Sequence, residues 1–146
     1  MVSSPDLSDL QLAVIRVLWD KGEASAAYVQ RALERSRPLA ITTVSTLLAR
    51  MEKRGVITHR AEGRTFIYRA RVSELEMRRK AISGMIRHLF RGNPSEVVGQ
   101  ILSEREVSEE DLARMRSLIE DTRSAERRNS YAAERRKLRG RQADGD

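Results

Sequence analysis

The amino-acid sequence predicts a mainly α protein of the α+β class, a winged helix-turn-helix of three helices and a β-hairpin followed by three further helices. Two observations lead to this prediction. Three short segments with apolar residues at helical spacing precede two β-like runs that flank a glycine turn. The net charge also changes sign along the chain, from +5 over residues 1–72 to −2 over 73–126 and +4 over 127–146.

The first two helices are marked by their N-terminal signals. Ser8 followed by Gln11 is a capping-box pattern, and it predicts a helix that ends at Gly22. Ser25 is placed to cap a second helix, which the segment before Pro38 interrupts. Both helices carry one apolar stripe, so we expect them to pack on a common core.

The third helix and the hairpin follow directly. Thr42 or Thr43 is the expected N-cap, and Gly55 suits the left-handed position after the last helical residue. Residues 56–61 and 65–70 then predict two strands, with Glu62-Gly63 as their turn. Three helices and a hairpin form a complete domain of about 70 residues, a size that folds alone.

The third helix carries the most informative pattern in the chain. Val44, Leu48 and Met51 form an apolar face, whereas the other face holds short hydroxyl groups and one cation. Small polar groups and arginine suit close approach to base edges and phosphates in a major groove. We therefore expect double-stranded DNA as the partner. The predicted contacts on this helix are Thr42, Thr43, Ser45, Thr46 and Arg50.

Further cations lie at the end of this helix and along the hairpin. Arg64 lies beside the turn, where it could contact phosphates or the minor groove. Arg60 and Arg69 could instead protect an edge strand from pairing with another chain. Lys53 and Arg54 could instead complement the negative end of the helix dipole. Lys53, Arg54, Arg60 and Arg64 complete the predicted DNA-binding set.

Residues 73–126 read as three amphipathic helices. Asn93-Pro94 and Ser108 are start signals for the second and third of them. About 50 residues with one apolar stripe per helix bury too little surface to fold alone, so we expect a homodimer. The expected dimer residues are Leu75, Ile82, Ile86, Leu89, Val98, Ile101, Leu102, Leu112, Met115, Leu118 and Ile119. Residues 127–146 form a basic tail, into which the last helix could continue, and we expect frayed or disordered structure after about Glu134.

Composition argues against several other classes of protein. The chain has no cysteine, which excludes disulfides and thiolate metal sites. His59 and His88 lie in no metal-ligand spacing or catalytic triad, so we expect no cofactor and no enzyme activity. No apolar run is long enough to span a bilayer, and residues 1–10 lack signal-peptide features. We therefore expect a cytoplasmic protein that does not insert into membranes.

Five segments follow one another along the chain: LSDLQLAVIRVLW, TTVSTLLARMEKRG, GRTFIYRA, GNPSEVV and VSEEDLARMRSLIE. Taken together, they resemble the penicillinase-repressor (BlaI/MecI/CopY) family over about residues 7–122. The resemblance implies a winged-helix domain, a helical dimerisation domain and repression at inverted-repeat operators. It also implies a role in antibiotic or cell-envelope stress responses. In well-studied members a membrane sensor-protease cleaves the repressor, and the matching bond here is Gln100-Ile101.

The chain departs from the family pattern in three places. Ile41, Thr42 and Ser45 stand where members often carry Pro, Lys and Arg, so the operator sequence cannot be transferred. The cleaved Asn-Phe pair is replaced by Gln100-Ile101, and the cysteines of the copper-responsive branch are absent. Two alternatives remain open: a ligand-sensing winged-helix regulator of another family, and a winged-helix module that binds a partner protein.

Overall fold

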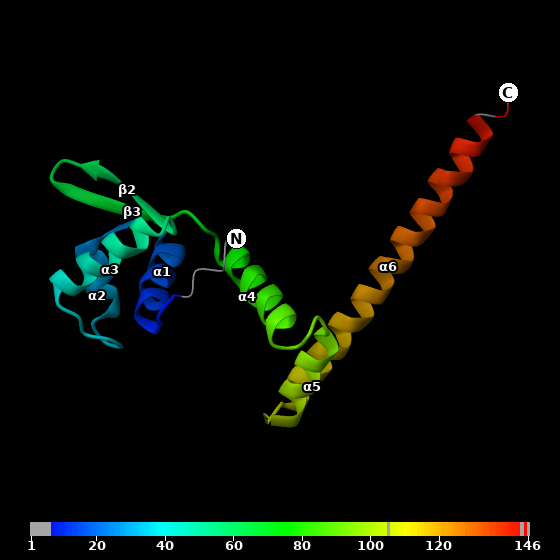
Figure 1. Cartoon of the computed structure of the whole chain (residues 1–146), viewed down its shortest axis with the longest axis horizontal. Coiled ribbons are helices and arrows are strands. Elements are labelled where there is room, and N and C mark those ends of the chain that lie inside the picture. The colour runs from blue at the N-terminus through cyan, green and yellow to red at the C-terminus, as the bar shows by residue number, and fades with distance from the viewer. Residues whose placement is uncertain (1–6, 105, 144, 146) are drawn as a thin grey trace. The chain divides into compact units, whose positions relative to one another are not determined.

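The computed structural model describes residues 7–104, 106–143 and 145. The chain divides into two units that meet between Pro94 and Ser95. The first holds α1 (Asp9–Lys21), β1 (Ala24–Ser25), α2 (Ala26–Leu33), α3 (Ile41–Lys53), β2 (Ile57–Glu62), β3 (Thr65–Ala70) and α4 (Glu74–His88). The second is made of α5 (Pro94–Glu104) and α6 (Glu109–Ala143) (Figure 1). The predicted α+β winged-helix fold is confirmed.

The predicted caps at the starts of α1 and α2 are present. The Ser8 hydroxyl accepts from the Gln11 amide at 3.2 Å, and the Gln11 side chain accepts from the Ser8 amide at 3.1 Å. Ser25 caps α2 by accepting from the Tyr28 amide. Gly55 follows α3 with a φ of 80°, as a left-handed residue after a helix requires. Local sequence therefore sets most boundaries in this unit.

The sheet has three strands in the order β1-β3-β2, all antiparallel. The sequence predicted the β2–β3 hairpin but not β1, whose two residues are too few to show a periodic pattern. Glu62 pairs with Thr65, so the turn residues are Gly63 and Arg64 rather than the expected Glu62-Gly63. Gly63 supplies the positive φ of 63° that a two-residue hairpin turn needs at its first position.

The core of the first unit lies between α1, α2, α3 and the sheet. Its largest fully buried side chains are Val14, Ile15, Leu18, Val29, Val44, Leu48, Met51 and Ile57. Each such side chain stabilises the fold by about 1.5–3 kcal/mol relative to exposure. Trp19 packs against this core, and its indole Nε1 donates to the Val72 carbonyl at 2.9 Å.

Helix α4 begins at the Ser73 cap and belongs to the same unit, because Met77 packs against the winged-helix core. The unit is therefore larger than the domain of residues 1–72 that the sequence predicted. That boundary and the one after residue 126 stay predictions, as does a dimerisation domain over residues 73–126.

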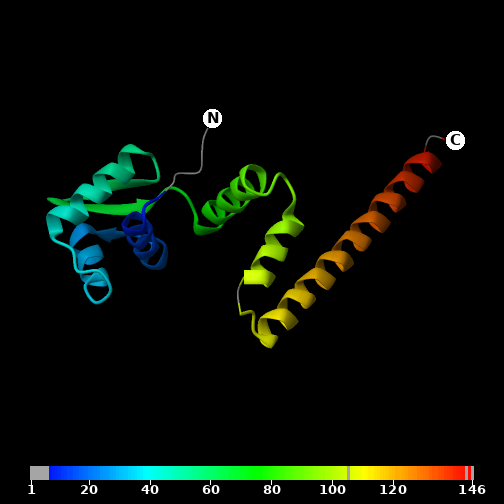
Figure 2. The same ribbon diagram turned by 60° about the horizontal axis from the view of Figure 1, so that its bottom comes forward.

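The expected disorder of the basic tail is not what the structure shows. Helix α6 runs without interruption through residues 127–143, drawn in orange to red in Figures 1 and 2. The segment YAAERRKLRGRQA holds three alanines, four arginines and one each of glutamate, lysine, leucine and glutamine, all of which are strong helix formers. Helix propensity explains the difference, because it continues where the apolar period ends. Residues 144 and 146 lie outside the described part.

Candidate nucleic-acid interface

Helix α3 lies against the core through Val44, Leu48 and Met51, all of which are fully buried. This fixes the rotation of the helix about its axis. Thr42, Thr43, Ser45, Thr46 and Arg50 are consequently exposed, as the sequence predicted. The short polar face is thus presented outward by a helix whose opposite side is anchored.

The N-terminus of α3 differs from the prediction. Ala40 is the N-cap, and no side chain caps the helix, so neither Thr42 nor Thr43 serves this role. A tertiary contact explains the earlier start. Leu39 packs against the core, and the Gln30 side chain donates to its carbonyl at 3.0 Å, which fixes the chain just before Ile41. Both threonines therefore lie in the first turn of the helix.

Four of the predicted contact residues share one shallow hollow on α3. Thr42, Thr43, Thr46 and Arg50 line it together with the half-buried Leu47. The Thr46 hydroxyl donates to the Thr42 carbonyl at 2.9 Å. The lone pairs of the Thr46 hydroxyl oxygen and the Thr46 methyl group remain available. Thr46 can therefore accept a hydrogen bond from a base amino group or contact a thymine methyl.

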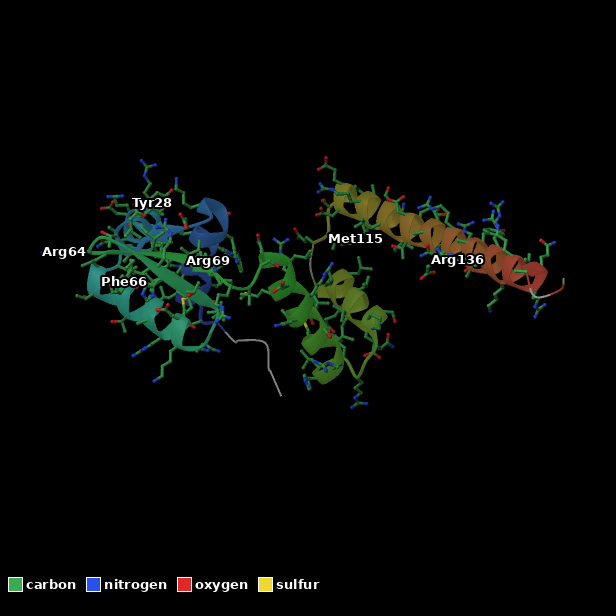
Figure 3. The ribbon with its side chains drawn as sticks, turned by 90° about the horizontal axis from the view of Figure 1, so that it is seen from above. Tyr28, Arg64, Phe66, Arg69, Met115 and Arg136 are labelled. Carbon is green, nitrogen blue, oxygen red and sulfur yellow. The ribbon has the colours of Figure 1, made fainter. Side chains whose placement is uncertain are left out.

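The hairpin provides a second exposed element. Arg64 is exposed and lies at the hairpin tip, next to Gly63 (Figure 3). Side chains alternate along paired strands. Phe66 therefore shares a sheet face with His59, whereas Arg60 and Arg69 share the other face. The hairpin thus presents its cations at the tip and on the face away from His59.

Arg60 makes two ion pairs within the protein. Its guanidinium lies 2.8 Å from a carboxylate oxygen of Glu23 and 2.8 Å from one of Glu62. The hydrogen bond from Arg60, followed by its charge, lowers the pKa of Glu23, and the two carboxylates raise the pKa of Arg60. The side chains of Arg60, Glu23 and Glu62 are 53%, 48% and 65% exposed, so the pairs add little stability. Binding of DNA by Arg60 stays a prediction, but its charge is already balanced locally.

Lys53 and Arg54 lie at the end of α3, and both are exposed. The Arg54 guanidinium approaches the side-chain oxygen of Gln11 on α1 at 3.5 Å. Arg50 and Lys53 place positive charge in the last turn, where they also complement the helix dipole. Binding of DNA by Lys53 and Arg54 stays a prediction.

Sequence reasoning did not assign a functional role to His59. Its Nδ1 lies 2.5 Å from Oε1 of Glu52 on α3. Its ring stacks on Phe66 with centroids 4.2 Å apart and tilts against Tyr68 at 5.5 Å. A single side chain thus joins α3 to both strands of the hairpin. The His59–Tyr68 strand register, invisible in the sequence, creates this cluster.

The apolar residues predicted to form a dimer are largely uncovered in the single chain. Leu75 and Ile82 on α4 and Leu89, the residue that caps its C-terminus, have exposed fractions of 55%, 49% and 72%. Also exposed are Val98, Ile101 and Leu102 on α5 and Leu118 and Ile119 on α6, whereas Ile86, Leu112 and Met115 are half-buried. Gln100 and Ile101, the suggested cleavage position, lie on α5 and are exposed.

None of the described helices is both long and apolar enough to cross a bilayer. No three histidine, aspartate or glutamate side chains within the described ranges are grouped so as to hold a metal ion.

Comparison with known proteins identifies the family. The family model described as penicillinase repressor matches residues 7–121. The penicillinase repressor of Bacillus licheniformis is 24% identical over 121 residues, covering 83% of this chain and 94% of that protein. The methicillin resistance regulatory protein MecI of Staphylococcus aureus strain N315 is 21% identical over 114 residues, covering 78% and 93%.

A solution structure of the Bacillus licheniformis repressor BlaI, in its monomeric form with the blaP half-operator, is 30% identical. It covers 52% of this chain and 93% of that one, with a TM-score of 0.44. The family match extends over most of the chain, in agreement with the resemblance drawn from the sequence motifs. The protein therefore belongs to the penicillinase repressor family, whose members are transcriptional repressors rather than enzymes.

Proposed function

We propose that this protein represses transcription by binding an inverted-repeat operator in duplex DNA as a homodimer. The observation that supports this most directly is the exposed face of α3. Its hydroxyls and Arg50 project from a helix whose other side is fixed by Val44 and Leu48. A rigid helix with short polar side chains suits entry into the major groove.

In this proposal, Ser45 and Thr46 read base edges, whereas Arg64 contacts the backbone. A randomised duplex library selected with the full chain provides the operator. Ser45→Ala and Thr46→Ala should change which sequences are selected. Arg64→Ala should weaken all duplexes about equally and lower the salt slope by about one per lost contact. An altered base preference in Arg64→Ala, with none in the two helix variants, would contradict this assignment.

Salt dependence separates DNA binding from the protein-interaction alternative. A dimer that neutralises about 6–10 phosphates should lose about 10³–10⁵ in affinity between 50 and 200 mM salt. Fluorescence anisotropy of a labelled operator measures this directly. Affinity that is weak and indifferent to salt would favour a module that binds a partner protein. A small molecule that releases DNA from the intact dimer would favour the ligand-sensing alternative.

The homodimer is supported by the exposed apolar side chains of α4, α5 and α6. Leu89, at 72% exposed, and Leu118, at 64%, would each remain in water in an isolated chain. Burial in a second copy would stabilise them by about 25 cal/mol per Å². Sedimentation of the full chain should give a dimer at micromolar concentration, and a monomer would contradict the proposal.

We propose that the repressor is released from DNA when its dimer is disrupted, in a response to antibiotics or cell-envelope stress. Gln100-Ile101 lies on α5 beside apolar residues assigned to the dimer. A protease site engineered at residues 99–102 should abolish tight operator binding once cut, because two tethered half-site contacts become independent. Full affinity after complete cutting and separation of the fragments would refute this. A natural sensor-protease partner would be encoded beside this gene.

A further inference from the structure

Helix α6 continues well past the part of the chain that matches the family. The match ends at residue 121, whereas the helix ends at Ala143. Residues 122–143 add about 33 Å of helix, at 1.5 Å per residue. The role assigned to the family does not account for this extension.

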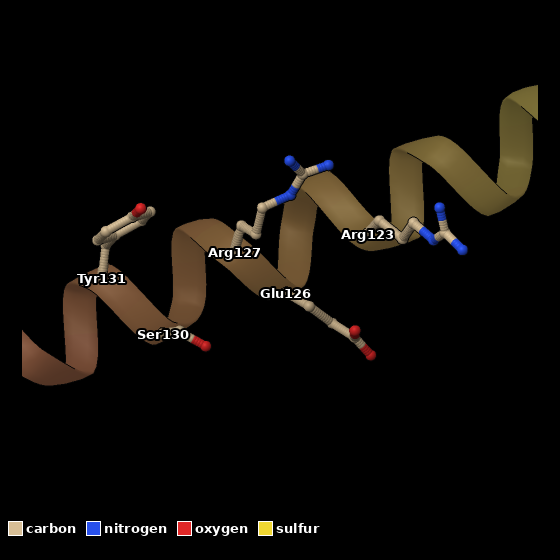
Figure 4. Close-up of a pocket in the computed structure, with 5 residues that line it drawn as sticks. All are labelled: Arg123, Glu126, Arg127, Ser130 and Tyr131. Atoms are coloured by element: carbon tan, nitrogen blue, oxygen red, sulfur yellow. The ribbon is translucent and has the colours of Figure 1, made fainter.

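The extension has one face on which positive charge is concentrated. Arg127, Arg128 and Arg135 each lie three or four residues from Tyr131, so all four share a face of the helix. Figure 4 shows Arg127 and Tyr131 on the same side of α6, with Glu126 and Ser130 turned away from them. Ala133 and Gly140 lie on the opposite side. We call the face formed by Arg127, Arg128, Tyr131 and Arg135 the basic face.

The protein's own carboxylates balance only part of this charge, although Glu134 also lies three residues from Tyr131 and so borders this face. Arg127 lies 3.1 Å from Glu120, and both side chains are more than 60% exposed. Within the described residues, Arg128 and Arg135 make no ion pair. The basic face therefore carries a net positive charge and is open to an anionic partner.

We propose that the basic face of α6 binds the phosphate backbone of duplex DNA flanking the operator, which rests on the function proposed above. Duplex DNA presents one negative charge per ~1.7 Å of its axis, so a long basic helix can release many counterions. Arginine donates hydrogen bonds in a fork that matches phosphate, and a tyrosine hydroxyl can also donate to a phosphate oxygen.

Two other occupants fit this face less well. A helix that lies on a membrane needs a broad face of bulky apolar residues. On the segment 127–143 the large apolar side chains are Tyr131 and Leu138, seven residues apart among cations. A second copy of the chain packed on the basic face would place like charges together. A coiled-coil seam fits poorly as well, because the seven-residue spacing that joins Leu112 and Ile119 continues to the charged Glu126.

The test compares two variants of the full chain with equal loss of charge. Arg128→Gln/Arg135→Gln removes two cations of the basic face. Arg136→Gln/Lys137→Gln removes two cations from the other side of the same turns, and Figure 3 labels Arg136. Glutamine preserves helix propensity in both variants, which circular dichroism checks. The probes are the selected operator without flanks and the same operator with flanking duplex on both sides.

Wild type should bind the flanked duplex more tightly than the bare operator. With four flank contacts per dimer, this gain should shrink about 100-fold between 50 and 200 mM salt. Arg128→Gln/Arg135→Gln should lose the gain and keep its affinity for the bare operator, whereas the control variant should keep both.

Three results would overturn the inference. These are no gain from the flanks in wild type, an equal loss of the gain in the two variants, and tighter binding of the basic face to phosphatidylserine vesicles than to flanking duplex. Absence of bare-operator binding in all three proteins would instead refute the proposed function. Absence of binding to either duplex would refute both.

Discussion

His59 on β2 contacts Glu52 on α3 through Nδ1 and Oε1, 2.5 Å apart, with both side chains about 30% exposed. The ring of Phe66 stacks on the same imidazole. This contact links the helix proposed to read DNA to the hairpin proposed to contact its backbone. The relative position of the two elements therefore depends on one side chain as well as on the core.

His59→Ala should weaken this link. Loss of one partly buried hydrogen bond lowers the free energy of unfolding by about 1 kcal/mol, and for a small domain this lowers Tm by about 4–8 °C. We also expect weaker operator binding, because the hairpin is less well oriented. Thermal denaturation and anisotropy measure the two effects. His88→Ala, on the exposed end of α4, is the matched control and should change neither quantity.

Tyr68 should make the fold sensitive to alkaline pH. Burial, and then the charge of Glu52, raise the pKa of its phenol above the ordinary value of 10.0. A group whose pKa is raised by folding stabilises the fold fully below the unfolded pKa, and this contribution is lost as pH rises through the folded pKa. The free energy of unfolding should therefore fall above about pH 10.

Urea denaturation across that pH range tests this expectation. Tyr68→Phe should flatten the decline, because no phenol remains to ionise in the core. The exposed Tyr131→Phe is the control, and it should leave the decline as in wild type. An unchanged decline in Tyr68→Phe would assign the alkaline loss to another group.

Trp19→Phe should destabilise the connection between α1 and the segment that leads into α4. The substitution keeps an aromatic ring but removes the donor to the Val72 carbonyl, which lies at 2.9 Å. The expected loss is about 1–3 kcal/mol, because a partly buried acceptor loses its partner. Chemical denaturation measures it. Tyr28→Phe, at another half-buried aromatic residue, should cost less, and equal losses would contradict the role of the hydrogen bond.

Ile119→Glu should convert the proposed dimer into a monomer. Its side chain is 55% exposed in the single chain, and a buried unpaired carboxylate in a dimer interface is costly. Sedimentation should show the change, while circular dichroism keeps the helical content. Leu138→Glu, at a leucine that is 63% exposed and lies outside the proposed interface, should remain a dimer. A dimeric Ile119→Glu protein would place the interface elsewhere.

Several features of the fold were predictable because they depend on residues close in sequence. The capping pair Ser8 and Gln11, the Ser25 cap and the left-handed Gly55 each combine a residue type with a nearby backbone group. The polar face of α3 was predictable for the same reason, since helical spacing separates Thr42 and Thr46 from Val44 and Leu48.

Other features depended on contacts between distant residues. The start of α3 at Ile41 follows from Gln30 holding the Leu39 carbonyl, and β1 exists because Ala24 pairs with Tyr68. The balance of charge at Arg60 requires Glu23, 37 residues away. None of these contacts leaves a periodic or local signal in the sequence.

The sequence by itself therefore determined the kind of fold, the polar face of α3 and the apolar helix faces that a single chain leaves exposed. Only the tertiary structure decided which cations remain available and how His59 joins α3 to the hairpin. The physical reason is how far apart in the sequence the interacting residues lie. Caps, turns and helix faces are set within a few residues, whereas ion pairs and strand register require partners brought together by the packed core.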